Sequence, residues 1–196
     1  MSRAALKTLF HPFESGMLPL PAATSRVLLL GAQPGFRTLA GFDCLWSPVQ
    51  GFRPDLLALQ HEGFDVAPRA KGTRFDAALV LAGRHRGENE LDLAEAIERA
   101  RDGTLIVVAG SNDDGIASLA KRIGKLVNIE GKSPKHHGLA FWFRTSADRS
   151  ALAAHLRQAN TYPLVAGRFD TAPGMFSHDR IDPGSKLVSN NVSASW

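Results

Sequence analysis

Apolar residues fill almost every position of three short runs, at 26–30, 75–82 and 104–109. A strand buried on both faces carries apolar side chains in consecutive positions, whereas a half-exposed strand alternates. These runs therefore predict neighbouring strands in the centre of a largely parallel sheet. Two shorter segments, 42–46 and 64–67, are predicted as further, weaker strands.

Segments with helical spacing of their apolar residues separate these runs. Helices are predicted over 3–10, 53–60, 87–101, 116–123 and 147–158. The helix at 87–101 has the clearest pattern, with glutamates in its first turn and arginines in its last, as the helix dipole favours. The first helix is expected to stop before Pro12, because 11–21 contains three prolines and Gly16.

A pair of strands at 125–130 and 139–144 is predicted near the end of this pattern, with no helix between them. Two strands joined only by a loop, here 131–138, form an antiparallel hairpin. Alternating strands and helices followed by a hairpin predict an open, mostly parallel α/β sheet with the hairpin at one edge.

Composition narrows the class of protein. The chain has 196 residues, of which 44% are hydrophobic and 21% charged, so it can bury a core. Its net charge of +4 is compatible with a polyanionic partner but is also ordinary for a solvated surface. A single cysteine, Cys44, excludes an internal disulfide framework and a multi-cysteine zinc site, and is expected to be a core thiol. With no leader and no membrane-length apolar run, the expectation is a cytoplasmic protein without a membrane partner.

The loop Gly31-Ala-Gln-Pro-Gly35 follows the first buried strand, where nucleotide-type cofactors bind in doubly wound folds. It matches neither the G-x-G-x-x-G nor the P-loop pattern, and no helical pattern follows it at once. We therefore interpret it as a strand-end turn and regard a cofactor site here as the less favoured alternative.

A second polar loop, Gly110 to Gly115, contains Asn112, Asp113 and Asp114. A metal or ribose site is one interpretation, but these side chains are also the usual N-caps of helices, which we favour. No metal site is predicted. Neither a Ser-His-Asp arrangement nor paired carboxylates at helical spacing occurs, so no catalytic residue is predicted.

Basic residues gather at two places that suit contact with RNA. Arg84 and Arg86 follow the second buried strand, and Lys132, Lys135 and His136 lie in the hairpin loop. Lysine and arginine contact the phosphate backbone, whereas neighbouring histidines on a strand point apart and rarely share a metal. An ordinary exposed surface is the alternative at both places.

The stretch after residue 170 has the features of a domain entry. Pro173-Gly174 predicts a turn, Asp182 is a candidate N-cap, and Pro183 suits the first position of a helix. Only a short polar segment follows Val188. We expect one domain at 1–170, and at 171–196 a linker with the start of a second, truncated domain.

Three stretches in this order, 110–118, 135–144 and 172–187, resemble the N-terminal half of guanine-N2 methyltransferases of small-subunit ribosomal RNA, in the "methyltransferase small" class. The most specific match is Pro173–Leu187, where the family has Pro-Gly-x-Phe-Ser-x-Asp-x-x-Asp-x-Gly-Ser. The resemblance is looser before Ala109 and stops after Val188. The family's cofactor motif Asp-x-Gly/Cys-x-Gly and its Asn-Pro-Pro-Phe motif are absent from this sequence.

The resemblance implies a degenerate sheet of the class I methyltransferase type. In that family the N-terminal domain has lost cofactor binding and assists folding and RNA recognition, while a C-terminal domain binds S-adenosylmethionine and carries catalysis. Small-subunit ribosomal RNA and the missing catalytic domain are thus the implied partners. The residues implied to line the cofactor pocket, once that domain is present, are Phe176, Ser177, Asp179, Asp182, Gly184 and Ser185.

The leading hypothesis is therefore a non-catalytic N-terminal part of an S-adenosylmethionine-dependent 16S ribosomal RNA (guanine-N2) methyltransferase, inactive by itself. Two alternatives stay open. One is a stand-alone RNA-binding or interaction module, and the other is a small-molecule α/β enzyme that uses the Gly31 or Gly110 loop.

Overall fold

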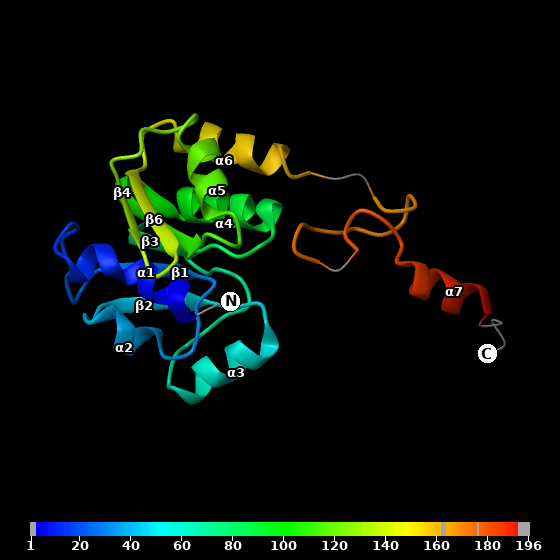
Figure 1. Cartoon of the computed structure of the whole chain (residues 1–196), viewed down its shortest axis with the longest axis horizontal. Helices are drawn as coiled ribbons and strands as arrows, with labels where there is room; N and C mark the ends of the chain where they lie inside the picture. The colour runs from blue at the N-terminus through cyan, green and yellow to red at the C-terminus, as the bar shows by residue number, and fades with distance from the viewer. Residues whose placement is uncertain (1–2, 162–163, 176, 192–196) are drawn as a thin grey trace.

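A six-stranded sheet forms the centre of the computed structural model, which describes residues 3–161, 164–175 and 177–191 (Figure 1). The strands lie in the order β2-β1-β3-β4-β6-β5. Strands β1 to β4 run parallel, β6 is antiparallel to β4, and β5 is antiparallel to β6. Their bounds are β1 Arg26–Leu30, β2 Leu45–Val49, β3 Phe75–Leu81, β4 Ala100–Ser111, β5 Gly131–Lys135 and β6 Gly138–Arg144. The predicted open α/β sheet with three central strands and an edge hairpin is confirmed.

Helices cover both faces of the sheet. On one face lie α1 (Arg3–Glu14), α2 (Phe36–Ala40) and α3 (Arg53–His61); on the other lie α4 (Arg86–Arg99), α5 (Ile116–Ile123) and α6 (Arg149–Gln158). Strand β1 shows why both faces are needed, because Val27 and Leu29 enter the first core and Leu28 and Leu30 the second. Strand β6 likewise buries Trp142 on one face and Phe141 and Phe143 on the other.

The first helix is longer than predicted. It continues through Pro12 to Glu14. A proline inside a helix removes one backbone hydrogen bond. Here the apolar face continues past it, and Phe13 is buried together with Leu9 and Phe10 against the sheet. Tertiary burial of Phe13 offsets the local disruption, which the pattern of prolines alone did not indicate.

The first strand of the hairpin has different bounds from those predicted. Residues 125–130 form no strand, since the amides of Lys125, Leu126 and Val127 bond back to carbonyls at the end of α5. Strand β5 occupies 131–135, which was predicted as loop. A two-residue turn at His136 and His137 joins the strands, with φ of 51° and 57°. Such left-handed pairs close type I′ hairpins, and histidine tolerates this region better than most residues.

The edge beyond β1 also differs from the prediction. Strand β2 covers 45–49 instead of 42–46, in register with β1 from Arg26 opposite Leu45 to Leu30 opposite Val49. The predicted strand at 64–67 is reduced to a single parallel bridge between Val49 and Ala67. Pro68 follows directly and has no amide hydrogen to donate, so pairing does not extend.

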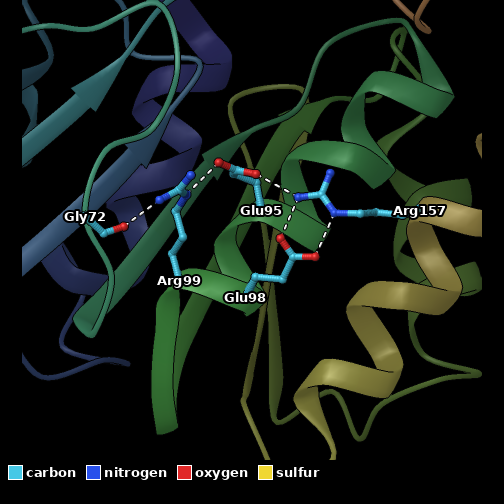
Figure 2. Close-up of polar contacts among 5 residues, drawn as sticks. All are labelled: Gly72, Glu95, Glu98, Arg99 and Arg157. Atoms are coloured by element: carbon cyan, nitrogen blue, oxygen red, sulfur yellow. Dashed lines mark hydrogen bonds and ion pairs between the residues drawn. The ribbon is translucent and has the colours of Figure 1, made fainter.

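Helix α6 is fastened to α4 by a charged cluster (Figure 2). The Arg157 guanidinium donates to both carboxylate oxygens of Glu98 at 2.7 and 2.6 Å and to Glu95 at 2.7 Å. Arg99 donates to Glu95 at 2.5 Å and to the Gly72 carbonyl at 2.6 Å. These hydrogen bonds lower the pKa of Glu98, chiefly through Arg157. The cluster positions α6, and the tail after it, relative to the sheet.

The tail after α6 contacts the domain at one turn and then leaves it. Met175 N donates to the Ala172 carbonyl and Gly174 has φ of 93°, so Pro173-Gly174 forms the predicted turn, of type II. Helix α7 (Pro183–Asn191) lies apart from the sheet, and none of its residues is buried (Figure 1). Asp182 accepts a hydrogen bond from Ser185 N at 2.9 Å, which confirms it as the N-cap.

Candidate functional site

The loops that follow the parallel strands gather at one edge of the sheet. They are the Gly31–Gly35 loop after β1, Gln50 after β2, the segment 82–85 after β3 and the segment 112–115 after β4. The hairpin turn reaches the same edge, because Gly138 pairs with Ser111 at the end of β4. In open α/β sheets ligands bind at this edge. It is therefore the place to look for a site.

Backbone groups of the loop at the cofactor position are hydrogen-bonded to side chains of the same protein. Both carboxylate oxygens of Glu62 accept a hydrogen bond from Gly35 N, at 2.9 and 3.0 Å. Gln50 stands at the end of β2, nineteen residues after Gly31 and thus where dinucleotide-binding folds place an acidic ribose ligand. Its amide donates to the Ala32 carbonyl at 2.7 Å and its carbonyl accepts from Phe52 N at 2.8 Å. The groups that would hold a nucleotide-type cofactor are thus already bonded.

A short helix, α2, does follow this loop, contrary to the prediction. Gly35 is its N-cap, with φ of 77° and no side-chain cap. Its apolar residues Phe36 and Ala40 are buried, and this burial holds five residues in a helix that sequence periodicity could not reveal. The hollow beside it measures about 590 Å³ and is lined by Gln33, Pro34, Gly35, Phe52, Asp55, Glu62 and Leu6.

The Gly110 loop is not capped as predicted. Gly115 is the N-cap of α5, with φ of 82°, and none of Asn112, Asp113 and Asp114 makes a side-chain cap. Among the described residues no group of three or more histidine, cysteine, aspartate or glutamate side chains could hold a metal. Burial, with repulsion from Asp43, raises the pKa of the Cys44 thiol to about 12, so this core residue stays protonated.

A pocket of about 380 Å³ lies where the β3–α4 segment meets the tail. We call it the basic pocket. It is lined by Arg84, His85, Arg86, Gly87, Ala159, Asn160, Pro173, Gly174 and His178. The lining contains no carboxylate, and within the described part of the chain the side chains of Arg84 and His85 make no hydrogen bond or ion pair. The guanidinium of Arg84 therefore places a positive charge in the pocket, at the ligand edge of the sheet, that no carboxylate of the lining neutralises.

A buried carboxylate organises the floor of the basic pocket. Glu90 of α4 is only 4% exposed and accepts hydrogen bonds from Arg86 at 3.2 Å, Arg122 at 2.8 Å and Asn160 at 2.8 Å. Burial raises the pKa of Glu90, but the hydrogen bonds from Asn160, Arg122 and Arg86 outweigh it and lower the pKa below its usual value. Glu90 is thus an anion that fixes three side chains from α4, α5 and the end of α6.

The predicted RNA contacts fall in three places. Arg84 and Arg86 line the basic pocket. Lys135 and His136 lie at the hairpin turn against α1, where the Lys135 carbonyl accepts from Thr8 at 2.9 Å and the His136 ring is 6.0 Å from His11. Lys132 lies beside α5, in a separate hollow that Lys121 also lines. The structure therefore brings Arg84 and Arg86 together in one pocket. It separates Lys132 from Lys135 and His136, although all three were predicted in one loop.

The residues predicted to line a cofactor pocket lie in the tail. Ser177, Asp182 and Ser185 border one hollow of about 250 Å³, together with Val165, Phe169, Thr171, Arg180 and Ile181. Gly184 lies in the first turn of α7, and the exposed Asp179 precedes it. Phe176 lies outside the described residues. The hollow is thus built from tail residues alone.

Sequence reasoning missed the other residues of the basic pocket. His85 belongs to the basic cluster Arg84-His85-Arg86 but is not predicted as an RNA contact, and no sequence pattern marks Asn160 after the last residue of α6. Asn160 meets Glu90 from seventy residues away, so no local pattern marks the contact. Gln50 carried a usable signal, since its spacing from Gly31 is that of a ribose ligand.

No protein-family model matches the sequence, and no curated protein matches it. No helix within the described ranges is long and apolar enough to cross a membrane.

Several solved structures that superpose on this chain are methyltransferases. The 16S rRNA N2 G1207 methyltransferase RsmC of T. thermophilus, solved with AdoMet and guanosine, superposes with a TM-score of 0.65 at 16% identity, over 95% of this chain and 51% of that one. The chain thus spans about half the length of RsmC. Ribosomal protein L11 methylase of Lactobacillus delbrueckii subsp. bulgaricus gives 0.55 at 10% identity, over 74% and 80%. A SAM-dependent O-methyltransferase of Thermotoga maritima gives 0.51 at 12%, over 69% and 64%. The fold is that of class I methyltransferases.

Proposed function

We propose that this chain is the non-catalytic, RNA-recognising half of an S-adenosylmethionine-dependent ribosomal RNA methyltransferase. In this role it binds small-subunit RNA and supports a catalytic domain that holds the cofactor. The division at 1–170 and 171–196 belongs to the proposal, with the tail as the connection to that domain.

The state of the cofactor position is the observation that carries the proposal. Glu62 occupies the Gly35 amide with two hydrogen bonds, and Gln50 takes the ribose position with both ends of its amide bonded to the backbone. Binding a cofactor here would require breaking these contacts and burying Asp55 and Glu62 near the ligand. The alignment with half of RsmC, a ribosomal RNA methyltransferase, supports the same assignment.

The tail supports a connection to a further domain. Leu187 and Val188 of α7 are 66% and 62% exposed, and Met175 and Phe169 are each 54% exposed. Apolar surface of this kind is characteristic of an interface. With a catalytic domain packed there, the hollow bordered by Ser177, Asp182 and Ser185 would adjoin the cofactor site, as would Gly184 in the first turn of α7.

A stand-alone RNA-binding module is a second candidate, because the basic pocket is complete within this chain. The two candidates differ in whether the chain increases the activity of a separate catalytic domain.

Two titrations of the purified chain test the proposal. Calorimetry with S-adenosylmethionine is expected to give no binding in the micromolar range. A labelled fragment of small-subunit ribosomal RNA is expected to bind, with an affinity that falls as salt rises. Micromolar cofactor binding would make the chain a catalytic candidate, and the absence of RNA binding would refute RNA recognition.

A further inference from the structure

We propose that the basic pocket binds one nucleotide of single-stranded RNA, with its phosphate at Arg84 and His85 and a hydroxyl or amine donor at Asn160 Oδ1. The inference rests on the proposed function and specifies where and how RNA is held. A volume of about 380 Å³ is at the lower end of ligand pockets, which suits a single small unit.

The charge of the pocket selects an anion. Arg86 and Arg122 share the one carboxylate of Glu90, which leaves an excess of positive charge, and Arg84 adds to it. Glu88 lies against Gly174 but does not line the pocket. Arginine binds phosphate through parallel N–H donors, so a phosphate group fits this side.

The backbone at the start of α4 adds donors of the same kind. His85 is the N-cap of α4, and its side chain makes no cap hydrogen bond. The first amides of a helix have no partner within the helix, and they favour anions. Arg86 and Gly87, the first two residues of α4, both line the pocket.

Asn160 supplies an acceptor beside the first turn of α4. It is 7% exposed, and its amide nitrogen donates to Glu90 Oε2 and to the Leu156 carbonyl, both at 2.8 Å. Both amide hydrogens are thus used, which fixes the orientation of the side chain. Its Oδ1 accepts no hydrogen bond from a described residue. Beside it lies Gly87, whose Cα–H is only a weak donor.

Among the described residues, Asn160 Oδ1 is not one of the side-chain atoms that are buried without a partner, so solvent reaches it from the pocket. A ligand that enters the pocket can replace this water with a donor of its own. A phosphodiester group carries no hydrogen to donate, so a nucleotide within a strand would donate to Asn160 Oδ1 from a hydroxyl or amine group elsewhere on the nucleotide. A ribonucleotide has both: the phosphate, and the 2′-hydroxyl or a base amine.

The pocket exists only because the tail closes it. Gly87 is so close to the tail that a Cβ there would lie 2.6 Å from Pro173 Cβ, and a Cβ on Gly174 would lie 2.7 Å from Glu88 Cδ. Gly87 has no room for a side chain against the Pro173 ring, whereas the Glu88 carboxylate beside Gly174 can move aside. The contact at Gly87 brings Pro173 and His178 to the segment 84–87. A strand of RNA in the pocket would therefore contact both the domain and the tail.

Fluorescence anisotropy with a labelled single-stranded RNA 12-mer, at several salt concentrations, tests the proposal. Arg84→Ala is expected to weaken binding about tenfold and to reduce the salt slope by about 1. The matched control is Arg69→Ala, the removal of an exposed arginine in the segment after Ala67, which is expected to change affinity less than twofold. A DNA 12-mer of the same sequence is expected to bind more weakly than the RNA. Equal affinity would overturn the 2′-hydroxyl as the donor to Asn160 Oδ1 and would assign that contact to a base amine, which DNA shares.

Photocrosslinking with 4-thiouridine in the same RNA locates the strand independently of any substitution. Crosslinks are expected in peptides that contain residues 83–88 or 172–178. RNA binding with equal effects of the two substitutions and crosslinks at the hairpin turn would overturn the pocket but leave RNA recognition intact. Competition by free AMP as effective as by the RNA would assign the pocket to mononucleotides instead. Absence of RNA binding by the unmodified chain would overturn both proposals.

Discussion

Gly87 at the start of α4 and Pro173 in the tail are in direct contact, and the contact leaves no space for a side chain at position 87. A Cβ there would lie 2.6 Å from Pro173 Cβ and 2.8 Å from Asn160 Oδ1. Glycine in a helix is ordinarily destabilising. Its presence here is explained by the approach of the tail.

Gly87→Ala is therefore expected to release the tail without unfolding the domain. Helix propensity alone would make the alanine variant more stable by about 1 kcal/mol, so a loosened tail would be due to the steric contact. Limited trypsin digestion should cleave after Arg168 and Arg180, both exposed, several times faster than in the unmodified protein. Gly51→Ala is the control, because a Cβ at Gly51 meets only the Pro68 carbonyl, at 4.0 Å. Equal cleavage rates in the two variants would contradict the contact.

Asp92 of α4 is expected to make stability depend on pH. Burial, together with repulsion from Glu88 and Glu95, raises its pKa from 3.8 to about 7. The folded protein then holds a proton that the unfolded chain loses near pH 4, so the free energy of unfolding falls as pH rises from about 4 to about 7.

Asp92→Asn removes this dependence, because asparagine stays neutral. At pH 8 the variant should be more stable by roughly 2–4 kcal/mol, and near pH 3.5 the difference should vanish. Urea unfolding at both pH values measures it. Asp113→Asn, at an exposed aspartate, should leave stability within about 0.5 kcal/mol. If Asp92→Asn is no more stable at pH 8, the carboxyl group is solvated in the folded protein.

Arg157→Ala is expected to loosen α6 from α4. The substitution removes three hydrogen bonds to Glu95 and Glu98 and leaves two neighbouring carboxylates to repel each other (Figure 2). A networked pair contributes more than an isolated surface pair, so a loss of about 1–2 kcal/mol is expected in thermal or urea unfolding.

The comparison for Arg157 is the exposed pair of Arg37 and Asp43, joined at 2.6 Å, with both side chains more than half exposed. Arg37→Ala should change stability by less than about 0.5 kcal/mol. Similar losses in the two variants would mean that the cluster of Figure 2 contributes no more than a surface ion pair.

The tail beyond Pro173 is expected to be the least stable part of the chain. Helix α7 has nine residues, none of them buried, and helices shorter than ~12–15 residues are marginal without tertiary contacts. Hydrogen exchange of α7 should therefore be complete long before that of residues 104–109, which lie in an interior strand. Equal protection would show that α7 packs on the domain in solution.

Much of the fold could be predicted because buried segments have a recognisable local pattern of apolar residues. Strands β1, β3 and β4 are apolar in consecutive positions since helices cover both their faces, and helix α5 was predicted with its observed bounds. The errors occur where local patterns compete with distant contacts. Residues 125–130 are apolar enough for a strand, but Val127 and Ile129 pack against the core without one, and pairing with β6 passes to Gly131–Lys135.

Only part of the candidate site could be predicted from the sequence. Arg84 and Arg86 could be selected because they are charged residues directly after a buried strand. Their pocket could not, because its other walls come from Asn160 and from the turn at Pro173. The degenerate glycine loop indicated an altered cofactor position, but not that Glu62 would fill it.

By itself, the sequence determined which segments are buried and which edge of the sheet carries polar loops. The reason is that the polarity of each side chain decides whether its burial is favourable. Only the tertiary structure decided that Glu90 joins Arg86, Arg122 and Asn160, and that Gly87 receives the tail. These contacts depend on the packing of α4 between the sheet and α6. The pattern of residues along the sequence does not contain the distances between segments that come together only when the chain folds.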